Sequence, residues 1–110
     1  NGGKNMRKYN FKRTLDSYSD LSKNEAAVKT ACLFKGYLEI MYKDLMKLNY
    51  KELSERIPSE NQRLRDLSRF FRMMHQNRGL NELSKEEVKK AIENCKYMVD
   101  NFNFEQLKRE

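Results

Sequence analysis

The fold of this chain is decided by the stretch LSKNEAAVKTACLFKGYLEIMYKDLMKL, which runs from Leu21 to Leu48. It begins with a capping box, because Ser22 and Glu25 can each bond a free backbone N–H at a helix start. The spacing of apolar residues, three and four apart over about six helical turns, predicts a helix over residues 23–49. The stripe consists of Ala27, Ala31, Phe34, Leu38, Met41, Leu45 and Leu48.

Further apolar residues widen this stripe beyond what one packed face requires. They are Val28, Leu33, Tyr37, Ile40 and Met46. We therefore expect the helix to lie at the centre of a bundle and to be covered on more than one side. Gly36, which has no side chain to keep a neighbour away, is expected to mark a close helix crossing.

A second long helix is predicted over residues 60–78. Ser59 is the expected cap, with Gln62 as its reciprocal partner, and Gly79 is the expected helix-terminating glycine. The apolar face of this helix comprises Leu64, Leu67, Phe70, Phe71 and Met74.

The remaining elements are also predicted to be helical. A capping box at Ser84 and Glu87 predicts the last helix, over residues 85–101. A short helical turn is expected near 51–57, and the apolar residues near the N-terminus fit a first helix over 5–19. The predicted fold class is therefore all-α, a compact bundle of four main helices plus a short helical turn.

The chain has 110 residues, which fit a single domain. We divide it into a basic N-terminal arm with a first helix, residues 1–21, and a bundle core, residues 22–110. The start without methionine leads us to expect a fragment of a larger protein. No uncharged stretch is long enough for membrane insertion. Cys32 and Cys95 lie in apolar stripes, so we expect buried thiols in a reducing intracellular compartment, the nucleus or the cytoplasm.

Arginine is concentrated in one part of this basic chain, whose net charge is +7. Six of the nine arginines lie between Arg56 and Arg78, a stretch without lysine. Guanidinium groups form fixed pairs of hydrogen bonds with carboxylates and phosphates. This segregation therefore favours an acidic ligand.

One outward stripe of the predicted 60–78 helix is cationic at 100° per residue. Like charges three and four residues apart repel, and only two acids, Glu60 and Asp66, are near enough in sequence to offset them. A solvated helix face is the alternative interpretation. The candidate residues for binding a partner or a phosphate are Arg65, Arg69, Arg72 and Gln76, with Arg63 and Arg78.

A second candidate surface is the segment Lys8-Tyr9-Asn10-Phe11-Lys12-Arg13. Cations alternate with rings there, as in proteins that bind single-stranded nucleic acid by phosphate attraction and base stacking. Lys8, Lys12 and Arg13 are therefore candidate phosphate-binding residues. The alternative is that Tyr9 and Phe11 anchor the first helix in the core while the cations are solvated.

Metal and catalytic patterns are weak. The chain has one histidine and no Cys-x-x-Cys pair, so we expect no metal, no cofactor and no enzyme. Cys32 and His75 could form a nucleophile and base pair, but nothing in the sequence orients the histidine.

Arg69 and His75, separated by five residues, resemble the Arg-x(4 to 6)-His element of HEPN-type helical ribonucleases. In that family, paired helices of a dimer form the active site. The resemblance covers seven residues and implies that Arg69 and His75 are catalytic. The chain departs from the pattern at Phe70, where the family usually has a polar residue.

These patterns lead to three functional hypotheses. The first is a non-enzymatic helical interaction module that docks an acidic or amphipathic segment of a partner protein, in a nuclear or nucleic-acid-associated assembly. The second is a nucleic-acid-binding domain that uses the basic arm and the arginine helix face. The third is a HEPN-like ribonuclease. The apolar stripe of the 23–49 helix would also serve a homodimer.

Overall fold

The computed structural model of the chain describes residues 2–42 and 47–101, and every regular element in these ranges is helical. The all-α prediction is confirmed, and the four expected main helices correspond to α1, α2, α4 and α6. The elements in chain order are α1 (Gly2–Ser17), the 3-10 turn η1 (Tyr18–Asp20), α2 (Lys23–Met41), α3 (Tyr50–Arg56), α4 (Gln62–His75), α5 (Gly79–Glu82) and α6 (Lys85–Asn101).

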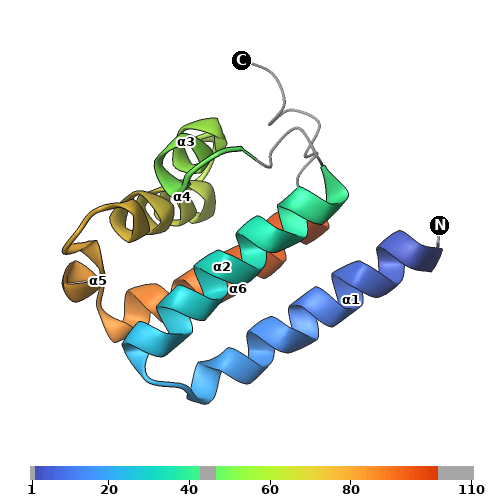
Figure 1. The fold of residues 1–110 in the computed structure, drawn as a ribbon, viewed down its shortest axis with the longest axis horizontal. Helices are drawn as coiled ribbons and strands as arrows, with labels where there is room; N and C mark the ends of the chain where they lie inside the picture. Colours follow the sequence, from blue (N-terminus) through green and yellow to red (C-terminus); the bar gives the residue numbers. More distant parts are fainter. Residues whose placement is uncertain (1, 43–46, 102–110) are drawn as a thin grey trace.

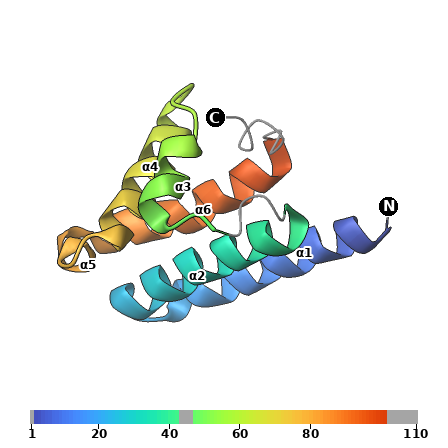
Figure 2. The same cartoon turned by 45° about the horizontal axis from the view of Figure 1, so that its top comes forward.

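The helices are arranged around α2 and α6, which pack against each other in the middle of the molecule (Figures 1 and 2). Helix α1 packs on one side of this pair, beside α2. Helices α3 and α4 form a hairpin on the other side, where α4 contacts both α6 and α2. The surfaces of α1 and of α4 therefore face different sides of the bundle.

A chain of aromatic rings links these layers through the core. The ring centroid of Phe11 in α1 lies 5.9 Å from that of Phe34 in α2. Phe34 in turn lies 5.4 Å from Phe71 in α4, and Phe71 lies 5.2 Å from Phe70. All four side chains are buried. Such aromatic contacts, together with the apolar area that they bury, account for much of the stability of a small core.

The predicted capping residue is found at two of the three helix starts, with both bonds of the capping box at α6 but only the Ser22 bond at α2. Ser22 accepts a hydrogen bond from the backbone N–H of Glu25, at 3.4 Å. At α6, Ser84 Oγ accepts from the N–H of Glu87 at 3.0 Å, and Glu87 Oε1 accepts from the N–H of Ser84 at 2.9 Å. The predicted bounds of the last helix are also confirmed, since α6 runs from Lys85 to Asn101.

The prediction of one helix over residues 23–49 is wrong, because α2 ends at Met41. A new helix, α3, begins at Tyr50, where Asn49 and Glu52 form a complete capping box. The apolar spacing continues past the end of α2, so spacing alone did not mark the break. Leu45 and Met46 lie outside the described residues. The short helical turn expected near 51–57 is confirmed as α3.

The predicted start and end of the third helix are also corrected. The cap is Asn61, not Ser59, because its side chain accepts from the N–H of Leu64 at 3.0 Å. Helix α4 ends at His75, and Gly79 begins the short helix α5. Gly79 does not adopt a left-handed conformation. Instead, a Cβ atom at this position would lie 1.8 Å from the backbone oxygen of Met73, so glycine is required by close packing.

Helix α2 is central and is covered by α1, α4 and α6, as predicted, but one of its faces remains open. Val28 and Ile40 are 48% and 59% exposed, because the helices that pack on α2 do not reach this face. Gly36 is not at a close crossing, since nothing lies within 4 Å of a Cβ atom placed there.

The two cysteines have different environments. Cys95 is buried in α6 as predicted, whereas Cys32 is exposed on the outward face of α2. The prediction that both thiols are buried is therefore wrong for Cys32.

Candidate binding surfaces

The stripe of arginines on α4, which comprises Arg65, Arg69 and Arg72, makes several contacts within the chain. Arg65 donates to the backbone oxygen of Ser59 and to Gln62 Oε1, both at 3.0 Å. Arg72 donates to Ser68 Oγ at 3.4 Å. Arg65 and Arg72 are exposed, as the helical angle predicted, and Arg69 is partly covered.

Arg69 is ion-paired across the bundle. Its Nε lies 3.0 Å from Oε2 of Glu87, in the first turn of α6. Helix packing therefore adds a carboxylate from far along the chain to Glu60 and Asp66, the two acids that are near in sequence. The pKa of Glu87 lies below its ordinary value, chiefly because the carboxylate accepts a hydrogen bond from the backbone N–H of Ser84. Partial burial opposes this shift, and the bond and charge of Arg69 add to it.

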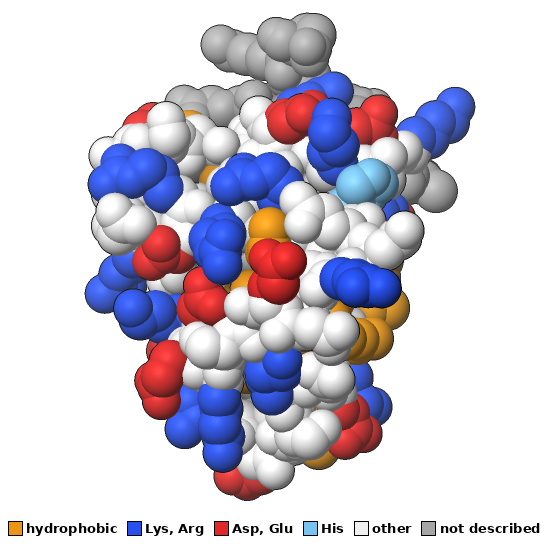
Figure 3. Space-filling model, turned by 90° about the vertical axis from the view of Figure 1, so that its left-hand side faces the viewer, with side chains coloured by type: hydrophobic (Ala, Val, Ile, Leu, Met, Phe, Trp, Pro, Cys, Tyr) orange, Lys and Arg blue, Asp and Glu red, His pale blue; other side chains and the backbone are white. Residues whose placement is uncertain are grey.

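The other candidate residues of this region are dispersed. Gln76 follows the end of α4, where its N–H bonds the oxygen of Met73. The Arg63 guanidinium lies 4.8 Å from the ring centroid of Tyr97, a cation–π contact. Arg78 is exposed just before α5. On this side of the molecule, cationic side chains are interspersed with acidic ones and do not form one continuous patch (Figure 3).

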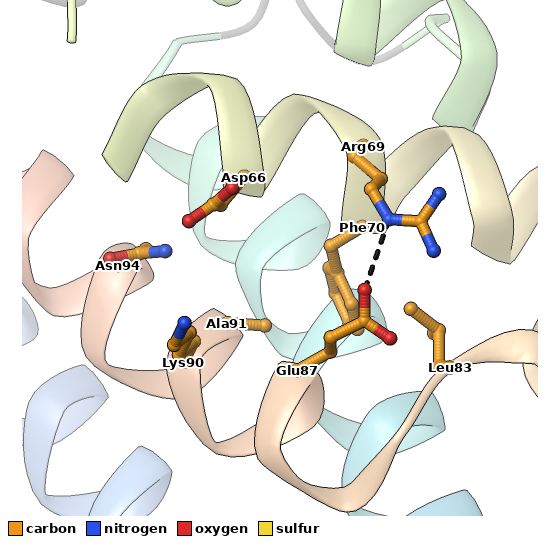
Figure 4. A pocket seen from close by; sticks show the side chains of 8 residues that line it. All are labelled: Asp66, Arg69, Phe70, Leu83, Glu87, Lys90, Ala91 and Asn94. Carbon is orange, nitrogen blue, oxygen red and sulfur yellow. Dashed lines mark hydrogen bonds and ion pairs between the residues drawn. The ribbon is translucent and has the colours of Figure 1, made fainter. Parts of the chain in front are cut away.

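The α4–α6 pocket lies beside the Arg69–Glu87 pair and has a volume of about 100 Å³. Figure 4 shows charged and polar side chains from α4 and α6 facing one another across it, above an apolar floor. The lining residues are Asp66, Arg69, Phe70, Leu83, Glu87, Lys90, Ala91 and Asn94. Sequence reasoning found Arg69 but missed the rest, because the pocket depends on how α4 packs on α6.

The cations of α1 are also partly engaged. Lys12 pairs with Asp100 of α6 at 2.8 Å, and Arg13 lies 5.8 Å from the ring centroid of Tyr9. Lys8 is half-buried. Of the two rings in this segment, Phe11 is a core anchor and Tyr9 is 58% exposed, so the core alternative holds for Phe11 only. These cations do not join the α4 arginines, since α2 and α6 lie between them (Figure 1).

The α1–α2 groove is the larger depression, with a volume of about 470 Å³. Arg7 is its one charged lining residue, and no lining residue is acidic. The lining comprises Arg7, Asn10, Phe11 and Thr14 of α1, and Cys32, Leu33, Gly36, Tyr37 and Ile40 of α2. Sequence reasoning assigned most of the α2 residues to a covered face. The excess of apolar residues over one stripe was the signal that could have indicated this groove.

The two residues of the ribonuclease-like element lie in different places. Arg69 lines the α4–α6 pocket, where Glu87 binds it. His75 is the exposed last residue of α4 and borders a separate depression beside α2 and α3, together with Lys35, Asn49, Tyr50 and Met74. Neither depression contains Cys32, which lines the α1–α2 groove. These placements do not assemble the Arg–His or the Cys–His pair.

Within residues 2–42 and 47–101, no group of three or more His, Cys, Asp or Glu side chains is placed to hold a metal ion. In the same ranges, no helix has both the length and the apolar character needed to cross a membrane. No protein-family model matches the chain, and comparisons with curated proteins and with solved structures also find no match.

Proposed function

We propose that this chain is a non-enzymatic interaction module that binds an acidic, amphipathic helix of a partner protein in the α1–α2 groove. The observation that carries this proposal is the composition of the groove lining. Five of its residues, counting the Cys32 thiol, offer apolar or aromatic surface, and its single charge is the cation Arg7. An amphipathic helix binds such a groove through its apolar face.

The size of the groove fits a helix of about two turns at the contact. From Cys32 to Ile40 the α2 wall runs about 12 Å, at 1.5 Å per residue. A partner helix could therefore place apolar anchors at positions i, i+3 or i+4, and i+7. The volume of about 470 Å³ lies within the range of roughly 300–1,000 Å³ that is usual for binding pockets.

The charge of the groove favours an acidic partner over a second copy of this chain. Arg7 lines one end of the groove. Arg13 lines a neighbouring depression on α1, together with Asn10, Thr14 and Ser17. Two copies that met at this face would bring these cations together, and each chain carries a net charge of +7. A partner with glutamates or aspartates beside its apolar face would complement them.

The first test is binding of a designed peptide, measured by fluorescence anisotropy. The peptide has about 16 residues, with leucine at i, i+3, i+4 and i+7 and mostly glutamate elsewhere. We expect this peptide to bind saturably. A scrambled peptide, in which the leucines do not share one face, should not bind. A lysine-for-glutamate version should also bind more weakly, because it meets Arg7 with like charge.

Three variants locate the binding face. Gly36→Leu should fill the groove without disturbing the fold, since the space around a Cβ atom there is empty, and should weaken binding at least about tenfold. Arg7→Glu should weaken it about threefold to tenfold at low salt. Arg72→Glu is the matched control, with the same charge change on the exposed face of α4. Loss of binding in Arg72→Glu alone would overturn the groove proposal and favour the arginine stripe.

Nucleic acid is the second candidate ligand, and the exposed Tyr9 ring with Arg13 beside it is the observation that favours it. Binding of a single-stranded oligonucleotide of about 20 nucleotides should be measured at low and physiological salt. Nucleic-acid binding would replace peptide docking as the proposed function if the oligonucleotide bound tightly and with salt dependence. Arg13→Glu and Tyr9→Ala would then weaken that binding, and Gly36→Leu would leave it unchanged.

A further inference from the structure

We propose that the outer face of α1 docks on an anionic membrane surface, at the level of the lipid headgroups. Two large apolar side chains, Met6 and Tyr9, lie one helical turn apart on α1 and are each 58% exposed. Five lysines and arginines lie between residues 4 and 13, and the chain has no acidic residue before Asp16. Exposed apolar side chains among cations are typical of helices that lie on anionic lipid.

Helix α1 has two apolar faces, and the core uses only one of them. Phe11 and Leu15 point inward and are 4% and 0% exposed. At 100° per residue, Met6, Tyr9 and Arg13 lie within about 60° of one another on the opposite side. Helix α1 lies at the edge of the bundle, where it packs against α2, α6 and η1 (Figure 1). The stripe of Met6, Tyr9 and Arg13, which we call the outer stripe, therefore points away from the core.

The cations around the outer stripe are free to meet an anionic surface. Arg7, Lys8 and Arg13 form no ion pair with another of the residues that the structure describes. The first acid of the chain, Asp16, is bound by Lys96 at 2.6 Å. Each basic residue held near an anionic leaflet strengthens binding about fivefold. Together these cations supply the attraction that a peripheral protein needs.

The uncharged side chains of the outer stripe distinguish a membrane from other polyanions. Tyrosine is enriched where a membrane meets water, because its ring lies among the headgroups while its hydroxyl reaches water. The Met6 side chain can enter the boundary of the acyl chains, but it offers a nucleic acid neither an aromatic ring for stacking nor a hydrogen-bond donor. A bilayer is the polyanion that uses both side chains.

This docking needs no helix that crosses the membrane. Helix α1 has 16 residues and is about 24 Å long at 1.5 Å per residue, so it can lie along the surface. The inference does not rest on the function proposed for the α1–α2 groove, because Met6, Tyr9 and Arg13 lie outside the groove lining.

The test is co-sedimentation of the full chain with large unilamellar vesicles of phosphatidylcholine, alone or with about 30% phosphatidylserine. We expect the anionic vesicles to bind the chain at least about tenfold more tightly than the neutral ones. Raising the salt concentration from about 0.1 M to about 0.5 M should weaken this binding, because salt screens the attraction.

Four changes locate the contact. Arg13→Glu should weaken vesicle binding at least about fivefold, and Arg72→Glu, the same charge change on the exposed face of α4, less than about twofold. The double change Met6→Ser and Tyr9→Ser should weaken it severalfold at constant charge. Val28→Ser, at a 48% exposed position of α2, is the control for this loss of apolar surface. Circular dichroism of each variant should show that the fold is retained.

The groove proposal and this inference fail independently. Gly36→Leu, which fills the groove, should leave vesicle binding unchanged. The inference is overturned by any of three results: no binding to the anionic vesicles, equal losses with Arg13→Glu and Arg72→Glu, or no loss with the double serine variant.

A single-stranded oligonucleotide of about 20 nucleotides, titrated under the same conditions, tests the other polyanion. We expect the vesicles to retain the chain in its presence. If the oligonucleotide displaces the chain from the vesicles and binds the Met6→Ser variant as it binds the wild type, then nucleic acid, and not a membrane, is the ligand of this face.

Discussion

The ring of Phe11 stacks on that of Tyr37, with 4.5 Å between the ring centroids, and this contact holds α1 against α2. Phe11 also contacts Phe34 and is 4% exposed. Phe11→Ala should therefore lower the free energy of unfolding by about 3–5 kcal/mol and loosen α1. Urea denaturation measures the first effect and amide hydrogen exchange of α1 the second. Tyr9→Ala, at a 58% exposed position of the same helix, should change stability by no more than about 0.5 kcal/mol.

Two glycines should respond to alanine in opposite directions. Gly79→Ala should destabilise the protein by about 1–3 kcal/mol, because the added methyl group meets the Met73 backbone and the chain must shift. Gly36→Ala should stabilise it by about 0.5–1 kcal/mol, because alanine favours a helix and the space there is empty. Thermal denaturation of both variants checks the signs. A destabilised Gly36→Ala protein would contradict the empty space around this position of α2.

Glu87 should make stability depend on pH in the acid range. Its pKa is lowered on folding, so its contribution is fully present above the ordinary carboxyl value of 4.5 and is lost as the pH falls through the lower value in the folded chain. The loss should be only about 0.5–1 kcal/mol between about pH 5 and pH 3, since the Arg69–Glu87 pair is partly exposed to water. Urea denaturation of wild type and Glu87→Gln over this range measures it.

The Glu87→Gln variant should show a flatter dependence, because glutamine keeps the capping hydrogen bond but does not titrate. Glu86→Gln is its control, on the same helical turn but without a bond to Arg69 or Ser84. The interpretation fails if Glu86→Gln flattens the curve as much as Glu87→Gln does.

The two thiols should differ sharply in reactivity. Cys32 is exposed, whereas Cys95 is fully buried and burial raises the pKa of its thiol, which keeps it protonated. A thiol-reactive dye should modify one cysteine in the native protein and the second only after unfolding. Cys32→Ser should remove the fast reaction, and two fast thiols in the wild type would contradict the buried placement of Cys95. A bulky label on Cys32 should also block peptide binding in the α1–α2 groove.

Helix starts could be predicted from the sequence because capping is local. Ser84 and Glu87 meet within one turn, so their spacing in the chain was enough. Helix ends were harder, since the apolar spacing continues past Met41. The start of α4 was predicted wrongly, since Asn61 and not Ser59 accepts the hydrogen bond from a first-turn N–H, that of Leu64.

The candidate sites could be predicted only where one helix determines them. The outward direction of Arg65 and Arg72 followed from helical angle. The Arg69–Glu87 pair joins residues 18 apart in sequence and depends on the packing of α4 on α6. The α1–α2 groove is the space that remains after α1 packs on α2, and sequence composition does not say which apolar residues, such as Ile40, stay uncovered.

The central position of α2 and α6 also determines how ligands could be combined. Helix α1, which lines the α1–α2 groove, and helix α4, which carries the arginine stripe, pack on different sides of this pair (Figure 1), so a partner in the groove would leave the surface of α4 uncovered. The chain could then bridge two molecules in a ternary complex, with either one arriving first. A change in the affinity of one ligand caused by the other would have to pass through the shared helices.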